Sequence, residues 1–186
     1  MNITVLIIIL IAAILLLWMV SLYNRLVARR NRVKEAWSGI DISLKKRYDL
    51  VPNLVETVKG YARHEKETLE RVTSYRTASV NATTQEQKAE AAAGLSRALG
   101  SLFAVAESYP DLKANVNFLE LQTELSNIEQ NLESARRYYN GVVRENNNLV
   151  ESFPSNIIAS MFGFKTSIFL EMEDTAHHER PNVSFS

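Results

Sequence analysis

The sequence predicts an all-α protein in which a transmembrane helix at the N-terminus precedes a long antiparallel up-down helical bundle. Three observations lead to this fold class. Glycine and proline are few, with 6 and 4 in 186 residues, and long strand-like alternation is absent. Residues 3–20 form an apolar run without a charge. Residues 110–153 repeat apolar side chains at alternating steps of three and four, as a long packed helix does. We expect four bundle helices, or three if a break between Asp49 and Pro52 is only a kink.

The apolar seam of residues 110–153 is the strongest helical signal in the bundle. It is apolar at every position except Asn146, and Pro110 and Pro154 bracket it. We expect one helix of about 40 residues that requires partner helices to cover it. The seam consists of Phe118, Leu121, Leu125, Ile128, Leu132, Ala135, Tyr139, Val142, Asn146, Leu149 and Phe153.

Residues 1–23 are predicted to be a retained transmembrane anchor. The run from residue 3 to 20 would span about 27 Å as a helix, and Trp18 and Tyr23 stand where interfacial aromatic residues belong. A cleaved signal peptide fits less well, because no basic region precedes the run and no small-x-small site follows it. A buried core helix also fits less well, because the run is apolar on every side.

A basic run follows the anchor and predicts its orientation. The positive-inside rule places the bundle in the cytoplasm and the N-terminus outside, which makes the chain a single-pass protein of the inner (plasma) membrane. The same side chains are candidates for contact with anionic lipid headgroups, although they need be no more than a topology signal. The run consists of Arg25, Arg29, Arg30, Arg32 and Lys34.

The bundle, residues 24–153, is expected to begin with helices at 21–48, 50–79 and 85–108. Asp49 would cap the second helix with Pro52 in its first turn, and Thr84 with Gln87 would form a capping box for the third. Tyr109 precedes a proline and should be extended. The last helix would exceed the third by about 18 residues, or about 27 Å. Either the third helix is longer, or the break near Pro52 is a kink in one long helix.

Residues 154–170 are rich in large apolar side chains but are too short and interrupted to span a bilayer. If the chain reverses near Pro52, the long helix returns this segment to the membrane interface, where Phe162, Phe164 and Lys165 would contact lipid. If the first two helices are one kinked helix, the segment would instead cap the far end of the bundle. Residues 171–186 read as a polar tail.

Several strings resemble the LemA family of bacterial membrane proteins: residues 47–62, 109–114, 117–122, 153–156 and 163–164. The resemblance extends from residue 1 to about 169. It implies an anchored antiparallel helical bundle and no established activity. Some relatives take part in magnetosome formation, which implies a membrane-organising role. The tail, with His177 and His178, lies outside the resemblance.

The sequence offers no catalytic, cofactor or metal site, so we expect a protein that is not an enzyme. There is no cysteine, and His64-Glu65 lacks the second histidine of a zincin motif because residue 68 is threonine. Neither a Gly-x-Ser-x-Gly elbow nor a phosphate-binding glycine loop occurs. His177 and His178 are adjacent on a tail and would point opposite ways. The formal net charge is zero, and we expect no nucleic-acid partner.

Two polar groups would meet at the membrane-distal end of an up-down bundle. They either cap helix ends and fix the turns, or form a docking surface for a protein partner. Separately, Asn146 in the seam, with Asn140 before it, either sets the register or oligomeric state or lies at an exposed end. The distal polar groups are Arg47, Asp49, Asn53, Glu56 and Lys59, together with Asp111, Lys113, Asn115 and Asn117.

Three functions remain open at this stage. The first is a non-enzymatic membrane-anchored scaffold that binds a membrane or cytoplasmic protein, or other copies of itself. The second is a membrane-organising protein that uses the basic run and residues 157–170 as a second lipid contact. The third is an adaptor for a membrane protease or another enzyme.

Overall fold

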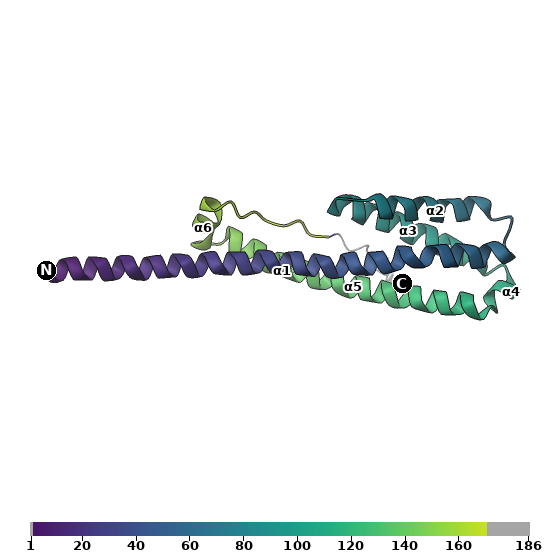
Figure 1. Cartoon of the computed structure of the whole chain (residues 1–186), viewed down its shortest axis with the longest axis horizontal. Coiled ribbons are helices and arrows are strands. Elements are labelled where there is room, and N and C mark those ends of the chain that lie inside the picture. The colour runs from purple at the N-terminus through teal and green to yellow at the C-terminus, as the bar shows by residue number, and fades with distance from the viewer. Residues whose placement is uncertain (1, 171–186) are drawn as a thin grey trace, which may run out of the picture.

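The computed structural model describes residues 2–170, and this part of the chain folds into six helices without a β-strand (Figure 1). The all-α prediction is therefore confirmed. The helices are α1 (Ile3–Tyr61), α2 (Lys66–Asn81), α3 (Gln85–Ala106), α4 (Pro110–Lys113), α5 (Val116–Glu151) and α6 (Ser155–Met161).

Helix α1 runs through the predicted break without interruption and is 59 residues long, about 88 Å. Of the two alternatives for Asp49–Pro52, the turn is wrong, and the one long helix is what the structure has. A proline inside a helix cannot donate to the carbonyl four residues earlier, which here belongs to Tyr48. The guanidinium of Arg76 on α2 supplies that donor, with Nε 3.3 Å from the Tyr48 oxygen. The lost helical hydrogen bond is thus replaced by a side chain from the next helix.

The chain first reverses at residues 62–65, so α2 begins at Lys66 and not at residue 50. The capping box before α3 is confirmed: the Gln87 backbone N–H donates to the Thr84 hydroxyl at 3.2 Å, and the Thr84 N–H donates to the Gln87 side chain at 3.3 Å. Tyr109 is extended before Pro110, as expected. The predicted last helix is divided into α4 and α5, because the Asn115 side chain accepts from the Phe118 N–H and starts a new helix.

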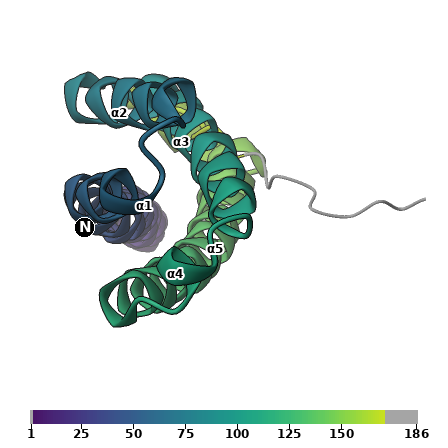
Figure 2. The same cartoon turned by 90° about the vertical axis from the view of Figure 1, so that its right-hand side faces the viewer.

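The unequal helix lengths are explained by α1. Helices α2 and α3 pair with each other beside the distal half of α1, whereas α5 packs along α1 itself and continues towards the N-terminal end (Figure 1). Seen end-on, α2, α3 and α5 form an arc around α1 (Figure 2). Helix α5 therefore runs back towards the N-terminal end of α1, although α1 is continuous. The expectation that a continuous first helix would make the last long helix point away from the membrane is wrong.

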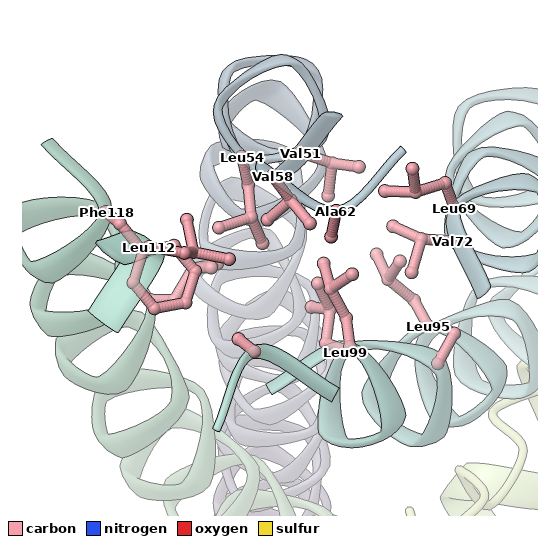
Figure 3. Close-up of a cluster of buried hydrophobic side chains, with 14 residues drawn as sticks. Val51, Leu54, Val58, Ala62, Leu69, Val72, Leu95, Leu99, Leu112 and Phe118 are labelled. Carbon is pink, nitrogen blue, oxygen red and sulfur yellow. The ribbon is translucent and has the colours of Figure 1, made fainter. Parts of the chain in front are cut away.

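Within residues 2–170 the buried apolar side chains form three clusters, and each includes one section of α1. The distal cluster joins α1 to α2, α3, α4 and α5 (Figure 3). The middle cluster joins α1 to α5, and the proximal cluster joins α1 to α6. From α1 they contain Val51, Leu54 and Val58 (distal), Val33, Ala36 and Ile40 (middle), and Leu22 and Leu26 (proximal).

The apolar seam faces the interior along most of α5. Seven of its members are buried, and Leu121, Ala135 and Leu149 are partly buried. Phe153 lies beyond the end of α5 and is 81% exposed. The buried members are Phe118, Leu125, Ile128, Leu132, Tyr139, Val142 and Asn146.

Leu125 and Leu119 provide a matched test of this orientation, since both are leucines on α5 but are 3% and 44% exposed. Leu125→Ala should lower the free energy of unfolding by about 2–5 kcal/mol, because it leaves a cavity in the distal cluster. Leu119→Ala should cost less than about 1 kcal/mol. Urea unfolding of the full chain in detergent micelles, followed by circular dichroism, measures both. Equal decreases in the free energy of unfolding for the two variants would mean that Leu125 is not on the buried face of α5.

Candidate functional site

The membrane-proximal end begins where α1 leaves its apolar stretch. Helix α1 is long and apolar enough to cross a membrane, and no side chain from residue 3 to residue 20 is buried by the bundle. Burial starts at Leu22, two residues after this run ends. The helix that contains the predicted anchor therefore becomes part of the bundle core with no connecting loop.

Helix α6 packs against α1 directly after the apolar stretch. Ile158 and Ala159 are buried against Leu22 and Leu26, because α5 returns far enough to deliver α6 to this level. The Phe164 N–H donates to the Ala159 carbonyl at 2.9 Å and ends the α6 turn. Residues 155–164 thus fold onto the first buried turns of α1.

Three aromatic rings pack together at the same level. Tyr23 of α1 makes edge-to-face contacts with Phe162 and Phe164, with ring centroids 4.9 Å and 5.7 Å away. The Arg30 guanidinium lies 5.2 Å from the centroid of the Phe164 ring, within cation–π range. Two of the predicted lipid-contact residues, Phe162 and Phe164, are therefore held beside the start of the bundle.

Large apolar side chains remain uncovered around α6. Phe162 is 53% exposed, and Lys165, three residues later, is also exposed. Ile158 and Ala159 cover the near end of the bundle and not its far end, and several large side chains around them form an exposed apolar rim whose contact with lipid stays a prediction. This apolar rim consists of Phe153, Ile157, Met161 and Phe162.

The basic run is divided between protein contacts and solvent. Arg29 forms an ion pair with Glu145 of α5, and Arg30 contacts Phe164 as described. A hydrogen bond with Tyr138 raises the pKa of Arg32. Arg25 and Lys34 are exposed. Part of the run therefore attaches α1 to α5 and to the segment after α6.

Because α1 continues to Tyr61, the polar group predicted near residue 50 is spread along the helix: Asp49 and Asn53 stand about 18 Å and 12 Å before its distal end. Tyr61 accepts a hydrogen bond from Asn115 at 2.9 Å, and Tyr109 donates to Glu65 at 3.0 Å, which raises the pKa of the Tyr109 phenol. Lys113 pairs with Glu107 at 2.9 Å. These bonds fix the turns between helices, and two of the predicted polar residues, Asn115 and Lys113, take part in them. The other members of the two predicted groups, apart from Arg47, have exposed side chains: Asp49, Asn53, Glu56, Lys59, Asp111 and Asn117.

Arg47, placed among these polar residues by the sequence analysis, is 1% exposed and lies in the interior instead of on that surface. Its Nη2 lies 2.7 Å from the Glu129 carboxylate of α5 and donates to the Ser96 hydroxyl of α3 at 2.6 Å. Its Nη1 donates to the Ala92 carbonyl at 3.2 Å. One guanidinium therefore connects α1, α3 and α5. Continuous helical spacing from Leu44 through Arg47 to Val51 was the signal for its burial.

Two asparagines of α5 hold the segment that follows α6. Asn147 accepts from the Ser167 N–H at 2.8 Å and donates to the Ser167 carbonyl at 2.9 Å. Asn140 accepts from the Leu170 N–H at 2.9 Å and donates to the Leu170 carbonyl at 2.8 Å. Each side-chain amide therefore pairs with both polar groups of one backbone residue. Asn140 stands out in the sequence, but this role does not, because the partner of its side chain is main chain.

Two neighbours of this asparagine pair complete the contact. The Tyr139 hydroxyl donates to the Ile168 carbonyl at 3.1 Å, and burial raises the pKa of the Tyr139 phenol. Asn146 is buried and donates to the Asn147 side chain at 3.2 Å. This bond helps to orient the Asn147 amide towards Ser167. Whether Asn146 also sets an oligomeric state stays a prediction.

No group of three or more metal-ligating side chains occurs within residues 2–170. The predicted weak candidates His177 and His178 lie outside the described residues.

Comparison with known proteins identifies relatives over most of the chain. A family model described as the LemA family matches residues 36–185. The match starts after the anchor and includes the tail, so the expected end of the resemblance near residue 169 is wrong. Protein LemA of Metamycoplasma hominis is 28% identical over 81% of this chain and 69% of its own length. Magnetosome proteins MamQ 1 and MamQ 2 of Paramagnetospirillum magneticum are each 24% identical over 80% of this chain, and the aligned part is 64% of their length, less than two thirds.

Two glutamates of α5 test the role of the buried guanidinium. Glu129 pairs with buried Arg47, whereas Glu133 pairs with Arg137 on the surface. Glu129→Gln should lower the free energy of unfolding by about 1–3 kcal/mol, because a buried cation loses its counter-ion. Glu133→Gln should change it by about 0.5 kcal/mol or less. Denaturant unfolding at one salt concentration compares them, and a larger loss for Glu133→Gln would contradict the assignment.

Proposed function

Because the chain belongs to the LemA family, we propose that it is a non-enzymatic, membrane-anchored scaffold that binds a protein partner or other copies of itself at the cytoplasmic face of the plasma membrane. The observation that carries this proposal is the continuity of α1 from Ile3 to Tyr61. A helix of this kind connects the predicted anchor to every packed cluster of the bundle.

The continuous helix supports a scaffold because it fixes where the bundle stands. Residues 21–61 of α1 lie beyond the apolar run and extend about 60 Å. Helices α5 and α6 return to Leu22 and Leu26, so the bundle is closed at the end nearest the anchor as well as at the far end. A bundle closed at both ends and joined rigidly to the anchor holds a partner-binding surface at a fixed distance from the bilayer.

The proposed orientation rests on charge. Basic side chains gather between residues 25 and 34, directly after the apolar run. The positive-inside rule then assigns the bundle to the cytoplasm. The exposed polar side chains at the distal end, such as Asn53, Lys59 and Asp111, are the proposed docking surface for a protein partner.

The apolar rim around α6 favours a second candidate function, membrane organisation. It surrounds α6, which packs on Leu22 and Leu26 just after the apolar run, and Phe162 of the rim contacts Tyr23. An interfacial segment there would give each copy a second lipid attachment. The similarity to magnetosome proteins agrees with a role at membranes.

A proximity-labelling enzyme that needs cytoplasmic ATP, fused after Ser186, tests the scaffold and its orientation together. We expect labelling, with some proteins enriched over a matched fusion of residues 1–23 alone. Absence of labelling would contradict the cytoplasmic orientation. Identical patterns from the two fusions would contradict partner binding by the bundle. Enrichment of a membrane protease would instead identify the adaptor role.

A spin label at Phe162 tests the second function. The chain lacks cysteine, so Phe162→Cys gives a single labelling site. In the full chain in lipid discs, the label should show high access to oxygen and low access to a water-soluble relaxation agent. Ile42, which is exposed on α1 about 30 Å beyond residue 22, is the control and should show the reverse. High aqueous access at both positions would rule out a lipid contact through the apolar rim.

A further inference from the structure

We propose that the face of α5 carrying Asn140 and Asn147 is a binding site for an extended polypeptide, and that neighbouring copies of this chain exchange residues 165–170 into it. We call residues 165–170 the strap. The inference rests on the proposed membrane anchoring and names the partner as a second copy of the chain.

The site recognises main chain. Each asparagine donates to and accepts from a single strap residue, Ser167 or Leu170, without using that residue's side chain. Asn140 and Asn147 lie seven residues apart, about 10.5 Å along a helix. Ser167 and Leu170 lie three residues apart, about 10 Å in an extended chain. The two spacings match, so the asparagine pair is built for an extended segment antiparallel to α5.

The strap in its own site leaves apolar surface uncovered. Ile168 and Phe169 are 69% and 46% exposed. They border a cavity of about 340 Å³ against the start of α3, whose lining includes Ala89 and Ala93. An occupant held in place by backbone hydrogen bonds, with its large side chains still exposed, gains further burial when a second copy covers it.

The connection between α6 and the strap permits exchange. Gly163 has φ +69°, a left-handed conformation that other residues rarely adopt, and Lys165 and Thr166 are exposed. From Gly163 to Ser167 an extended chain reaches about 14 Å. Packed helices lie about 8–10 Å apart, so a strap can reach α5 of an adjoining copy while its own α6 stays docked.

Membrane anchoring favours exchange between copies. Copies inserted with one orientation present Asn140 and Asn147 at the same height above the bilayer. Confinement to a plane raises their effective concentration, and exchange of identical segments needs no new type of contact. The same bonds then form between chains instead of within one.

Photo-crosslinking in vesicles tests the exchange. Donor copies carry one affinity tag and a photoreactive amino acid at Ile168, whose exposed side chain makes none of the asparagine bonds. Acceptor copies carry a second tag and are co-reconstituted with the donors. We expect adducts between donor and acceptor that map to α3 or to residues 136–147 of α5. Adducts confined to single chains would overturn the exchange.

Changes made only in the acceptor separate site binding from simple proximity. Asn140→Asp combined with Asn147→Asp keeps the side-chain shape but removes both N–H donors, and should lower the intermolecular adduct at least about tenfold. Either single change should give an intermediate yield, and circular dichroism checks that the helices persist. Asn148→Asp, at an exposed neighbouring position, should leave the yield unchanged. Adducts insensitive to the double change would overturn the proposed site.

Vesicle flotation distinguishes this inference from the proposed function. Protein that fails to float would contradict membrane anchoring, whatever the adducts. Protein that floats but gives only intramolecular adducts would leave the anchored scaffold standing and overturn the strap exchange.

Discussion

Burial of one face of α1 is the constraint on which the rest of the structure depends. Each apolar cluster within residues 2–170 takes one section of this helix as its centre. Helix α5 alone is long enough to cover the middle section, so it must run back along α1 towards the anchor. The α2–α3 pair covers the distal section, and α6 covers Leu22 and Leu26. The buried stripe of α1 is longer than α2, α3, α4 or α6. Several helices must therefore pack along it one after another, and this requirement sets their arrangement. The buried guanidinium of Arg47 fixes the crossing of α1, α3 and α5 within that arrangement.

Features coded by neighbouring residues could be predicted from the sequence. The apolar seam predicted the buried face of α5, and the Thr84 capping box predicted the start of α3. The uncharged apolar run predicted that the first section of α1 is not covered by the bundle. The path of the chain near Pro52 could not be predicted in the same way. Its compensation comes from Arg76, whose contact with the Tyr48 carbonyl joins residues 28 positions apart. The sequence around Pro52 does not reveal this distant contact. The known cost of a proline inside a helix therefore favoured a break at this position.

Arg47 and the strap illustrate different limits of prediction. The burial of Arg47 could have been predicted once the break was removed, because its spacing continues the stripe of α1. The docking of the strap could not have been predicted from the sequence. Asn140 and Asn147 bind backbone groups, and every residue except proline carries both of them. Nothing in the identity of Ser167 or Leu170 marks them as partners. Paired hydrogen bonds from a side-chain amide to main chain become visible only when the chain is folded.

The continuity of α1 has a mechanical consequence. Because the helix has no joint between its apolar run and Tyr61, the bundle must follow any inclination of the segment within the bilayer. Transmembrane helices incline by about 20° on average and adjust this angle to the thickness of the hydrocarbon layer. Over an arm of about 60 Å, such an angle moves the far tip sideways by about 20 Å. With its apolar run in a bilayer, α1 would thus convert small differences in bilayer thickness into large displacements of the surface around Lys59 and Asp111.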